Sequence, residues 1–439
     1  MEAQMSKYSR LLGKSFLSIE YHSCRSRNPV FTGLSGLPLS RERQWNGIFQ
    51  HLANTYYLDF GFWHLTFMVL MMLPLQIEKI YLDEKAEKDS VTQTILKALP
   101  DIPIEAVRDK RALIKQFFSM SDPIGIGKKH LFITHFYGRL LKPCPGTSNH
   151  ICCGYYVINA ITNCPLDCSY CVLQGYLNNP FLTLYTNWEE LLQEIEAFVS
   201  IDRQSFLRLG TGELSDSLAL ESIFPLSQML IPFFTKRYHA ILELKTKSAN
   251  VNPLLHLEHQ GKTVVSWSLN PPQIIEEEEM GTALLEERIE AARKCQEKGY
   301  PLGFHFDPLI DYDGWERGYQ ETILQLFKLI DPRGVVWISL GGFRYPPKLK
   351  AIAEERFPKT RVFLGELFPG RDAKFRYLKE IRVEMYQKMA GWLKEADPDL
   401  FIYLCMESKE VWEKVFGWAP ENSRHLNQLF EKRLKGFAK

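Results

Sequence analysis

Six short apolar runs alternate with amphipathic helical patterns, and this alternation restricts the fold more than any other feature of the 439-residue chain. Strands that are each followed by a helix form βα units, and successive βα units build a parallel sheet. The sequence therefore predicts an α/β fold around a parallel sheet. The predicted strands span 154–161, 206–210, 240–245, 264–269, 302–309 and 335–340, and the predicted helices span 188–199, 218–234, 284–297, 315–329 and 348–355.

Three cysteines with CxxxCxxC spacing, Cys164, Cys168 and Cys171, directly follow the first predicted strand. Three thiols this close cannot all pair with one another as disulfides, but they can ligate one metal centre. Short fixed cysteine spacings are typical of iron–sulfur clusters. Three ligands in place of four leave one iron without a protein ligand, and catalytic metal sites keep such an open position.

Two other interpretations of these cysteines stay open. Positions i, i+4 and i+7 also share one face of a helix, where three small side chains can belong to the core. Zinc is the second alternative, although no second pair of ligands follows at the spacing of a zinc motif. Pro165, Asp167 and Ser169, which lie between the cysteines, favour a loop and therefore a cluster.

The cysteine motif, with the aromatic Tyr170 before its third cysteine, resembles the signature of the radical SAM superfamily. Further stretches resemble the spore photoproduct lyase family in their order and spacing, from about residue 77 to the C-terminus. The resemblance implies an incomplete (β/α)6 barrel with N-terminal and C-terminal α/β extensions, and barrels of this kind carry their chemistry at the carboxyl ends of the strands. The matching stretches are 171–177, 210–216, 243–247, 265–270, 288–292, 299–304, 313–319 and 342–346.

The resemblance also implies the cofactors. The three cysteines would hold a [4Fe-4S] cluster, and its fourth iron would bind S-adenosylmethionine (SAM). One electron, from a donor such as flavodoxin or ferredoxin, would cleave SAM to a 5′-deoxyadenosyl radical that abstracts hydrogen from the substrate. In such enzymes the protein supplies binding, orientation and exclusion of water.

Residues at the ends of the predicted strands match the positions with which the family binds SAM. Simpler alternatives remain for three of them: residues 210–213 can be a plain turn, Lys245 can be solvated, and Tyr170 can be a packing residue. Tyr170 and Glu213 match catalytic positions, with Tyr170 packed beside the adenine and cluster. Asp307 is a weaker candidate for the ribose hydroxyls. The predicted SAM-binding residues are Gly212, Glu213, Ser215, Asp216, Lys245, Ser268 and Asn270.

Two positions depart from the family pattern. Glu213 stands where the lyase has the cysteine that returns a hydrogen atom to the repaired product, and Val172 stands where it has a tyrosine. SAM cleavage is expected to survive both changes, whereas repair of a thymine-dimer lesion in DNA has lost its hydrogen donors. The alternatives are a radical SAM enzyme for another nucleic acid or a small molecule, and a non-catalytic iron–sulfur redox sensor.

The evidence in the sequence for a nucleic-acid partner is divided. A net charge of +1 gives no bulk attraction for nucleic acid. Basic residues interleaved with aromatic ones suit phosphates and unstacked bases, but such a face is equally common in ordinary proteins. These residues are Phe343, Arg344, Tyr345, Lys348, Lys350, Arg371, Lys374, Arg376, Tyr377 and Arg382.

Four parts are predicted along the chain. Residues 1–73 are expected to be a poorly ordered extension, and a start site placed too early is one explanation, with Met71 or Met72 as candidate true starts. Its apolar run 60–75 is shorter than the roughly 20 residues of a membrane span, so no membrane anchor is expected. Residues 74–150 are expected to form an N-terminal α/β region with helices at 89–99 and 104–120, and residues 151–345 the partial barrel. Residues 346–439 are expected to form a C-terminal α/β extension with helices at 373–394 and 409–416 and a strand at 401–405.

The nine cysteines are an odd number without a regular framework, so a disulfide scaffold is not expected. A labile cluster indicates a reducing cytoplasm. Cys144, Cys152 and Cys153 are candidates for a second cluster, a redox role or a replacement hydrogen donor, with ordinary partly buried thiols as the alternative. The acidic run 276–279 is expected to be a solvated loop.

Overall fold

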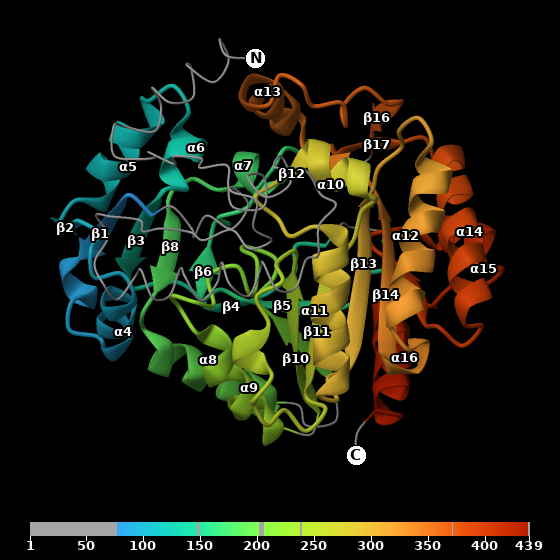
Figure 1. Ribbon diagram of the computed structural model, residues 1–439, viewed down its shortest axis with the longest axis horizontal. Helices are drawn as coiled ribbons and strands as arrows, with labels where there is room; N and C mark the ends of the chain where they lie inside the picture. The colour runs from blue at the N-terminus through green and yellow to red at the C-terminus, as the bar shows by residue number, and fades with distance from the viewer. Residues whose placement is uncertain (1–76, 147–149, 202–205, 238, 371, 438–439) are drawn as a thin grey trace, which may run out of the picture. The chain divides into compact units, whose positions relative to one another are not determined.

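Seven parallel strands form the centre of the computed structural model, which describes residues 77–146, 150–201, 206–237, 239–370 and 372–437. They belong to a curled eight-stranded sheet of order β18-β14-β13-β11-β10-β9-β5-β4, in which β4 pairs antiparallel with β5 (Figure 1). All six predicted strands are present, which confirms the half-barrel fold. The strands are β4 (Leu141–Pro143), β5 (Tyr155–Ile158), β9 (Leu207–Gly210), β10 (Ala240–Thr246), β11 (Thr263–Ser268), β13 (Leu302–Leu309), β14 (Val335–Gly342) and β18 (Ile402–Leu404).

Helices follow the strands as the alternation predicts. The helix predicted at 218–234 begins only at Leu226, because the preceding residues form turns that end at Pro225. The short helices η2 (Asn252–Leu254) and η3 (Pro332–Gly334) lie in connecting loops. The main helices are α8 (Trp188–Ile201), α9 (Leu226–Thr235), α11 (Leu285–Glu297), α12 (Trp315–Leu329) and α13 (Pro347–Arg356).

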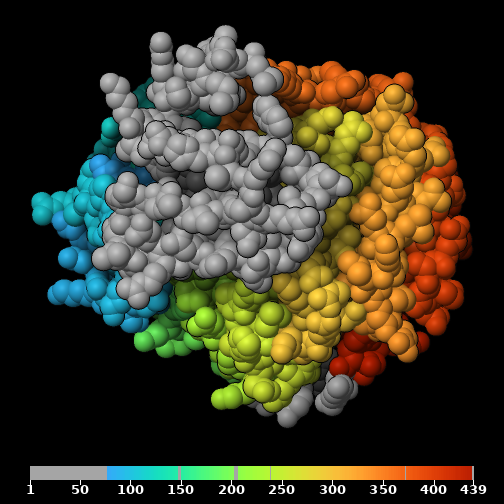
Figure 2. All heavy atoms as spheres, in the orientation of Figure 1, coloured from blue at the N-terminus to red at the C-terminus, as the bar shows by residue number. Residues whose placement is uncertain are grey.

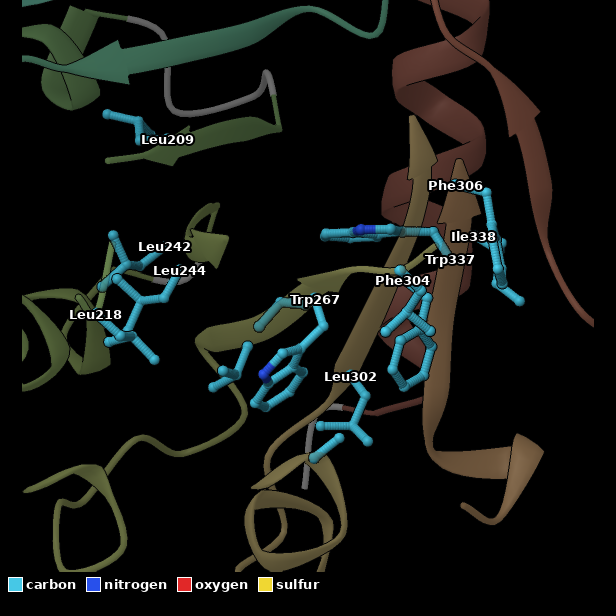
Figure 3. Packing of buried hydrophobic residues seen from close by; sticks show 14 of the residues in the cluster. Leu209, Leu218, Leu242, Leu244, Trp267, Leu302, Phe304, Phe306, Trp337 and Ile338 are labelled. Carbon is cyan, nitrogen blue, oxygen red and sulfur yellow. The ribbon is translucent and has the colours of Figure 1, made fainter. Parts of the chain in front are cut away.

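Side chains alternate between the two faces of each barrel strand. In Figure 3, Leu242 and Leu244 of β10 lie beside Leu218, and Trp267 of β11 lies beside Leu302 of β13. All five are buried in the hydrophobic core. Residues at the intervening positions, such as Glu243 and Lys245, therefore face the interior of the barrel, because successive strand residues point to opposite sides.

One isolated bridge joins the segments that follow the two edge strands of the curled sheet. Ile151, which follows β4 along the chain, forms an isolated antiparallel bridge with Glu407, which follows β18. The Ile151 N–H donates to the Glu407 carbonyl at 3.0 Å. Since β18 lies in the predicted C-terminal extension, that segment adds an edge strand to the barrel sheet.

A second sheet has the strand order β2-β1-β3-β8-β6. Its strands come from both sides of the predicted boundary near residue 150, since β6 and β8 belong to the predicted barrel segment. The helix predicted over 104–120 is wrong in its first part, where β2 pairs parallel with β1. The elements are β1 (Lys79–Asp83), η1 (Glu84–Ala86), α4 (Ser90–Ala98), β2 (Ile104–Val107), α5 (Lys110–Phe118), α6 (Pro123–Gly127), β3 (His130–Thr134), β6 (Ile161–Thr162) and β8 (Leu182–Tyr185).

The C-terminal residues add a small antiparallel sheet and three helices. The predicted helix at 373–394 begins at Lys379, because 375–377 is a strand, and α16 was not predicted. Figure 2 shows the orange and red residues of this segment joining the surface formed by the second half of the barrel. These elements are β15 (Arg344–Tyr345), β16 (Leu367–Pro369), β17 (Phe375–Tyr377), α14 (Lys379–Ala396), α15 (Lys409–Phe416) and α16 (Ser423–Lys435).

Two expectations concern residues that the structure leaves undescribed. The predicted extension 1–73, with its candidate start sites, and Arg371 both lie outside the described residues. Among the helices that are described, none has the length and apolar character needed to cross a membrane.

Glu221 is a buried carboxyl group whose pKa burial raises to about 7, although hydrogen bonds from Ser227 oppose the shift. Its unfolded value is near 4.3, so between these two pH values the folded state holds a proton that the unfolded state has lost. Stability from this group is therefore lost as pH rises from about 4.5 to about 7. We expect wild type to lose about 2–3 kcal/mol between pH 5 and 7.5 relative to Glu221→Gln, measured by urea unfolding. Equal pH dependence of the two proteins would contradict this.

Candidate metal centre and ligand site

The three motif cysteines lie in a loop between β6 and the short helix α7 (Leu173–Tyr176). Within the loop, β7 (Asp167–Cys168) pairs antiparallel with β12 (Glu279–Met280). Asn163 begins the loop with a φ of 69°, accepts the Cys164 N–H at 2.9 Å and donates to the Pro180 carbonyl at 2.7 Å. The cysteines share no helix, so the alternative of a helical core stripe is wrong.

The thiols of this loop are free and lie close enough to influence one another electrostatically. Cys164 and Cys168 are buried and Cys171 is partly buried, and burial raises the pKa of Cys164 to about 12. In the described residues, no group of three His, Cys, Asp or Glu side chains is arranged to hold a single metal ion. Three closely spaced cysteine thiols are a donor set typical of iron–sulfur clusters, in which each thiolate ligates its own iron.

Two buried cations support the cysteine loop from outside the motif. Lys128 donates to the Leu166 carbonyl at 2.6 Å and to Asp167 at 2.8 Å. Arg356, on α13, donates to the other Asp167 oxygen at 2.8 Å. Burial alone would lower the pKa of Lys128, but Asp167 and the neighbouring thiols raise it. A positive side chain thus remains beside a loop that would carry thiolates.

Glu279 is the centre of a buried polar network that holds Tyr170 against the barrel. Its carboxylate accepts hydrogen bonds from Tyr170, from Asn270 at 2.8 Å and from Lys247 at 3.0 Å. Its second oxygen pairs with Arg288 at 2.5 Å, and neither side chain is exposed. Although burial alone would raise it, the pKa of Glu279 is lowered by Arg288 and Lys247. The network fixes the position of the third cysteine through its neighbour Tyr170.

The prediction of a solvated loop at 276–279 is wrong. These residues end α10 (Pro272–Glu278) and enter β12, and the side chains of Glu278 and Glu279 are buried. Glu278 accepts a hydrogen bond from the Ser169 hydroxyl, and its carbonyl accepts the Ser169 N–H at 2.9 Å. The acidic run therefore binds the cysteine loop.

After β9, the loop 211–217 brings several predicted ligand residues to the barrel mouth. Asp216 accepts the N–H groups of Leu218, Ala219 and Lys247 and the Thr246 hydroxyl, so its oxygens are engaged within the protein. By contrast, the buried Ser215 hydroxyl has no hydrogen-bond partner among the described residues. Buried polar atoms are usually paired, so this hydroxyl is a candidate to contact a bound ligand.

Gly212 lies against β10 so closely that a side chain does not fit. A Cβ atom there would lie 2.6 Å from the Lys245 Cβ and 2.9 Å from the Lys245 carbonyl oxygen. We expect Gly212→Ala to destabilise the protein by about 1–3 kcal/mol in urea unfolding, because the backbone of the loop must move. Gly391→Ala is the matched control, since a Cβ on this exposed position of α14 meets nothing within 4 Å. Equal midpoints for the two variants would contradict the expectation.

Lys245 and Glu213 form an ion pair at the mouth, with 3.6 Å between Nζ and Oε1. Burial alone would lower the pKa of Lys245, but Glu213 and Asp307 raise it, so the lysine is charged. Asp307 itself binds Arg344 at 3.1 Å, which occupies it within the protein. Ser268, the last residue of β11, is buried, and its carbonyl accepts a hydrogen bond from Arg288 at 2.9 Å.

The barrel interior below the mouth contains a second polar network that the sequence did not reveal. Glu243 accepts hydrogen bonds from Ser266 at 3.0 Å and Trp337 at 3.2 Å, and it contacts His305 at 2.9 Å and Arg208 at 3.1 Å. Although burial alone would raise it, the pKa of Glu243 is lowered by His305 and Arg208. These side chains meet at Glu243 because they come from neighbouring strands at positions that face the barrel interior. From the sequence, only a pattern of polar residues at inward-facing strand positions could have indicated this network.

Acidic partners neutralise three of the basic residues predicted to face nucleic acid. Arg344 binds Asp307, Arg376 binds Asp372 at 2.5 Å, and Arg382 binds Glu407 at 2.7 Å. Burial lowers the pKa of Lys374. Lys348 is exposed, and the partly buried Lys350 lies 3.8 Å from Glu354. The described residues therefore offer little free positive charge in this region.

The structure brings most predicted site residues together at the carboxyl ends of the strands. Gly212, Glu213 and Ser215 follow β9, Lys245 lies near the end of β10, and Ser268 ends β11. The polar atoms of three other predicted residues, Tyr170, Asp216 and Asn270, are hydrogen-bonded within the protein. Asn270, for example, also accepts a hydrogen bond from the Tyr319 hydroxyl at 2.7 Å. The residues of these buried networks that the sequence analysis did not single out are Lys128, Glu243, Glu278, Glu279, Arg288 and Arg356.

Comparisons with known sequences point to one family. The sequence model of the family described as "Spore photoproduct lyase" matches residues 148–398. The spore photoproduct lyase of Bacillus subtilis is 32% identical over 214 residues, which are 48% of this chain and 63% of the relative. That of a Geobacillus species is 29% identical over the same shares. The alignments thus span less than two thirds of these relatives.

Solved structures share the fold. A cysteine-to-alanine mutant of spore photoproduct lyase superposes with a TM-score of 0.67 at 24% identity, covering 76% of this chain and 99% of that one. A double mutant with bound AdoMet and dinucleoside spore photoproduct superposes with a TM-score of 0.66 at the same identity and shares. At this level of identity the likeness establishes the architecture described above.

Proposed function

Because this chain belongs to the spore photoproduct lyase family of the radical SAM superfamily, we propose that it cleaves SAM reductively and abstracts hydrogen from an organic substrate. The observation that carries the proposal is the fixed loop of three free cysteines facing a barrel mouth with an unpartnered serine. When bound, a [4Fe-4S] cluster supplies the electron that splits SAM into methionine and a 5′-deoxyadenosyl radical.

Cys164, Cys168 and Cys171 would ligate the cluster. The opposed charges of Glu213 and Lys245 complement the amino-acid part of SAM, whose ammonium would bind Glu213 and whose carboxylate would bind Lys245. Ser215 and Ser268 would donate or accept hydrogen bonds, and Gly212 keeps the loop close to β10. Tyr170, Asp216 and Asn270 act as positioning residues that hold the surrounding loops.

The first candidate substrate is a dithymine lesion in DNA, because structures of the family's lyase contain dinucleoside spore photoproduct. The second candidate is another nucleic acid or a small molecule. Two observations favour this second candidate. Glu213 stands at the hydrogen-donor position implied by the family and is paired with Lys245. The arginines Arg344 and Arg376 are bound to carboxylates, so they are not free to bind phosphates. Flavodoxin or ferredoxin is the proposed electron donor, and the cytoplasm the proposed compartment.

Anaerobic reconstitution with iron, sulfide, SAM and dithionite tests the reaction class. We expect 5′-deoxyadenosine to form, whereas a redox sensor would reduce its cluster without forming it. Adding DNA that carries spore photoproduct then tests the substrate: unchanged lesion beside abundant 5′-deoxyadenosine would reject repair and retain the radical enzyme.

Lys245→Met tests the proposed SAM contact. We expect the Kd for SAM to rise about 10–100-fold, because a charge-assisted hydrogen bond contributes about 1.5–3 kcal/mol. Isothermal titration of the reconstituted protein measures it. Lys298→Met, at the exposed end of α11, is the control. Equal affinities in the two variants would remove Lys245 from the SAM site.

A further inference from the structure

Four free cysteines outside the motif lie in the segments that follow the two edge strands of the barrel sheet. We name them the seam thiols: Cys144, Cys152, Cys153 and Cys405. They come from three separate segments of the chain. The family match and the proposed reaction assign none of them.

Backbone pairing sets this convergence. The Cys144 N–H donates to Tyr155 at 2.8 Å and so extends the β4–β5 ladder, while the Cys405 N–H donates to Leu340 at 2.8 Å and extends the β18–β14 ladder. Cys152 follows Ile151, whose bridge to Glu407 joins these segments. The Cys152 N–H is fixed by the Ser423 hydroxyl at 2.9 Å.

Side-chain contacts agree with this placement. The Cβ that an alanine at Gly146 would carry lies 3.3 Å from the Cys152 sulfur, and the Gly146 N–H donates to the Cys144 carbonyl at 2.7 Å. Arg344 donates to the Cys405 sulfur at 3.4 Å. The turn at Gly146 therefore brings the Cys152 sulfur close to the Cys144 backbone.

We propose that the seam thiols form a thiol–disulfide exchange site for low-molecular-weight disulfides, with Cys152 as the attacking thiol and Cys144 as the resolving thiol. The Cys152 thiolate attacks one sulfur of the disulfide, forms a mixed disulfide and releases one thiolate. The Cys144 thiolate then attacks the Cys152 sulfur and releases the second thiolate, which leaves an intramolecular disulfide. The protein dithiol is oxidised by two electrons, and the added disulfide is reduced to two thiols.

The chemistry of the two thiols supports this order. The hydrogen bond from Cys153 lowers the pKa of Cys152 to about 7, against the effect of burial, so that a large fraction is thiolate near neutral pH. Burial raises the pKa of Cys144, which therefore needs a nearby mixed disulfide to react. The attacking thiol is expected to be the one with the pKa closest to ambient pH.

The test treats the anaerobically reconstituted full chain with oxidised glutathione at pH 7.5, blocks remaining thiols with iodoacetamide and maps linkages by peptide mass spectrometry. We expect a Cys144–Cys152 disulfide. In Cys144→Ser we expect a stable glutathionyl adduct on Cys152, and in Cys152→Ser neither product. Cys295→Ala, in α11 and outside the seam thiols, is the control and should react as wild type.

The result is independent of SAM cleavage, because linkage is read out without turnover. Unchanged disulfide formation in Cys152→Ser, or linkage of Cys152 to any cysteine other than Cys144, would overturn the proposal. Circular dichroism of each serine variant shows whether it is folded, and an unreactive but folded wild type overturns the proposal as well.

Discussion

Replacing Cys168 by alanine is expected to leave the reconstituted protein colourless and to reduce 5′-deoxyadenosine formation to background. Cys168 lies in the two-residue strand β7 that pairs with β12, at the middle of the cysteine loop. Removing one of three thiolate ligands leaves two irons without protein ligands, and cluster binding depends on the complete cysteine set. Iron and sulfide analysis, the visible absorption spectrum and product chromatography measure the effect.

The control for this prediction is Cys295→Ala. Cys295 is a fully buried cysteine of α11, outside both the loop and the seam thiols. It should keep its iron and its SAM cleavage. Retained cleavage in Cys168→Ala would remove the cluster assignment, and with it the proposed reaction.

Glu279→Gln is expected to destabilise the protein by about 3–5 kcal/mol, because it leaves Arg288 as a buried charge without its partner. The variant also weakens the contacts of Tyr170 and Lys247, so iron loading should fall together with stability. Urea unfolding and iron analysis of the same preparations measure both effects.

Glu277→Gln is the matched control, because Glu277 is the exposed neighbour of this network on α10. It should change stability by no more than about 0.5 kcal/mol, as exposed substitutions usually do. Similar losses in both variants would show that the acidic run acts through its overall charge, and would contradict the role given to the buried carboxylate.

The parts of the fold that the sequence predicted well are those with strong local periodicity. The bounds of β13, α12 and α15 agree with the predicted ranges, because their apolar residues repeat with the period of a strand or helix. The strand β2 and the late start of α14 were missed, since short exposed strands carry little pattern. Topology was predictable because βα units restrict how a sheet can be ordered.

The sequence by itself determined the three cysteines, their spacing and the ligand residues at strand ends, since all of these are local features of the chain. Only the tertiary structure decided what holds them. Tyr170 meets Glu279 across 109 residues, and Asp167 meets Arg356 across 189. A charged residue has no local pattern that distinguishes a solvated position from a buried one. The folded chain decides this by placing an opposite charge beside the residue.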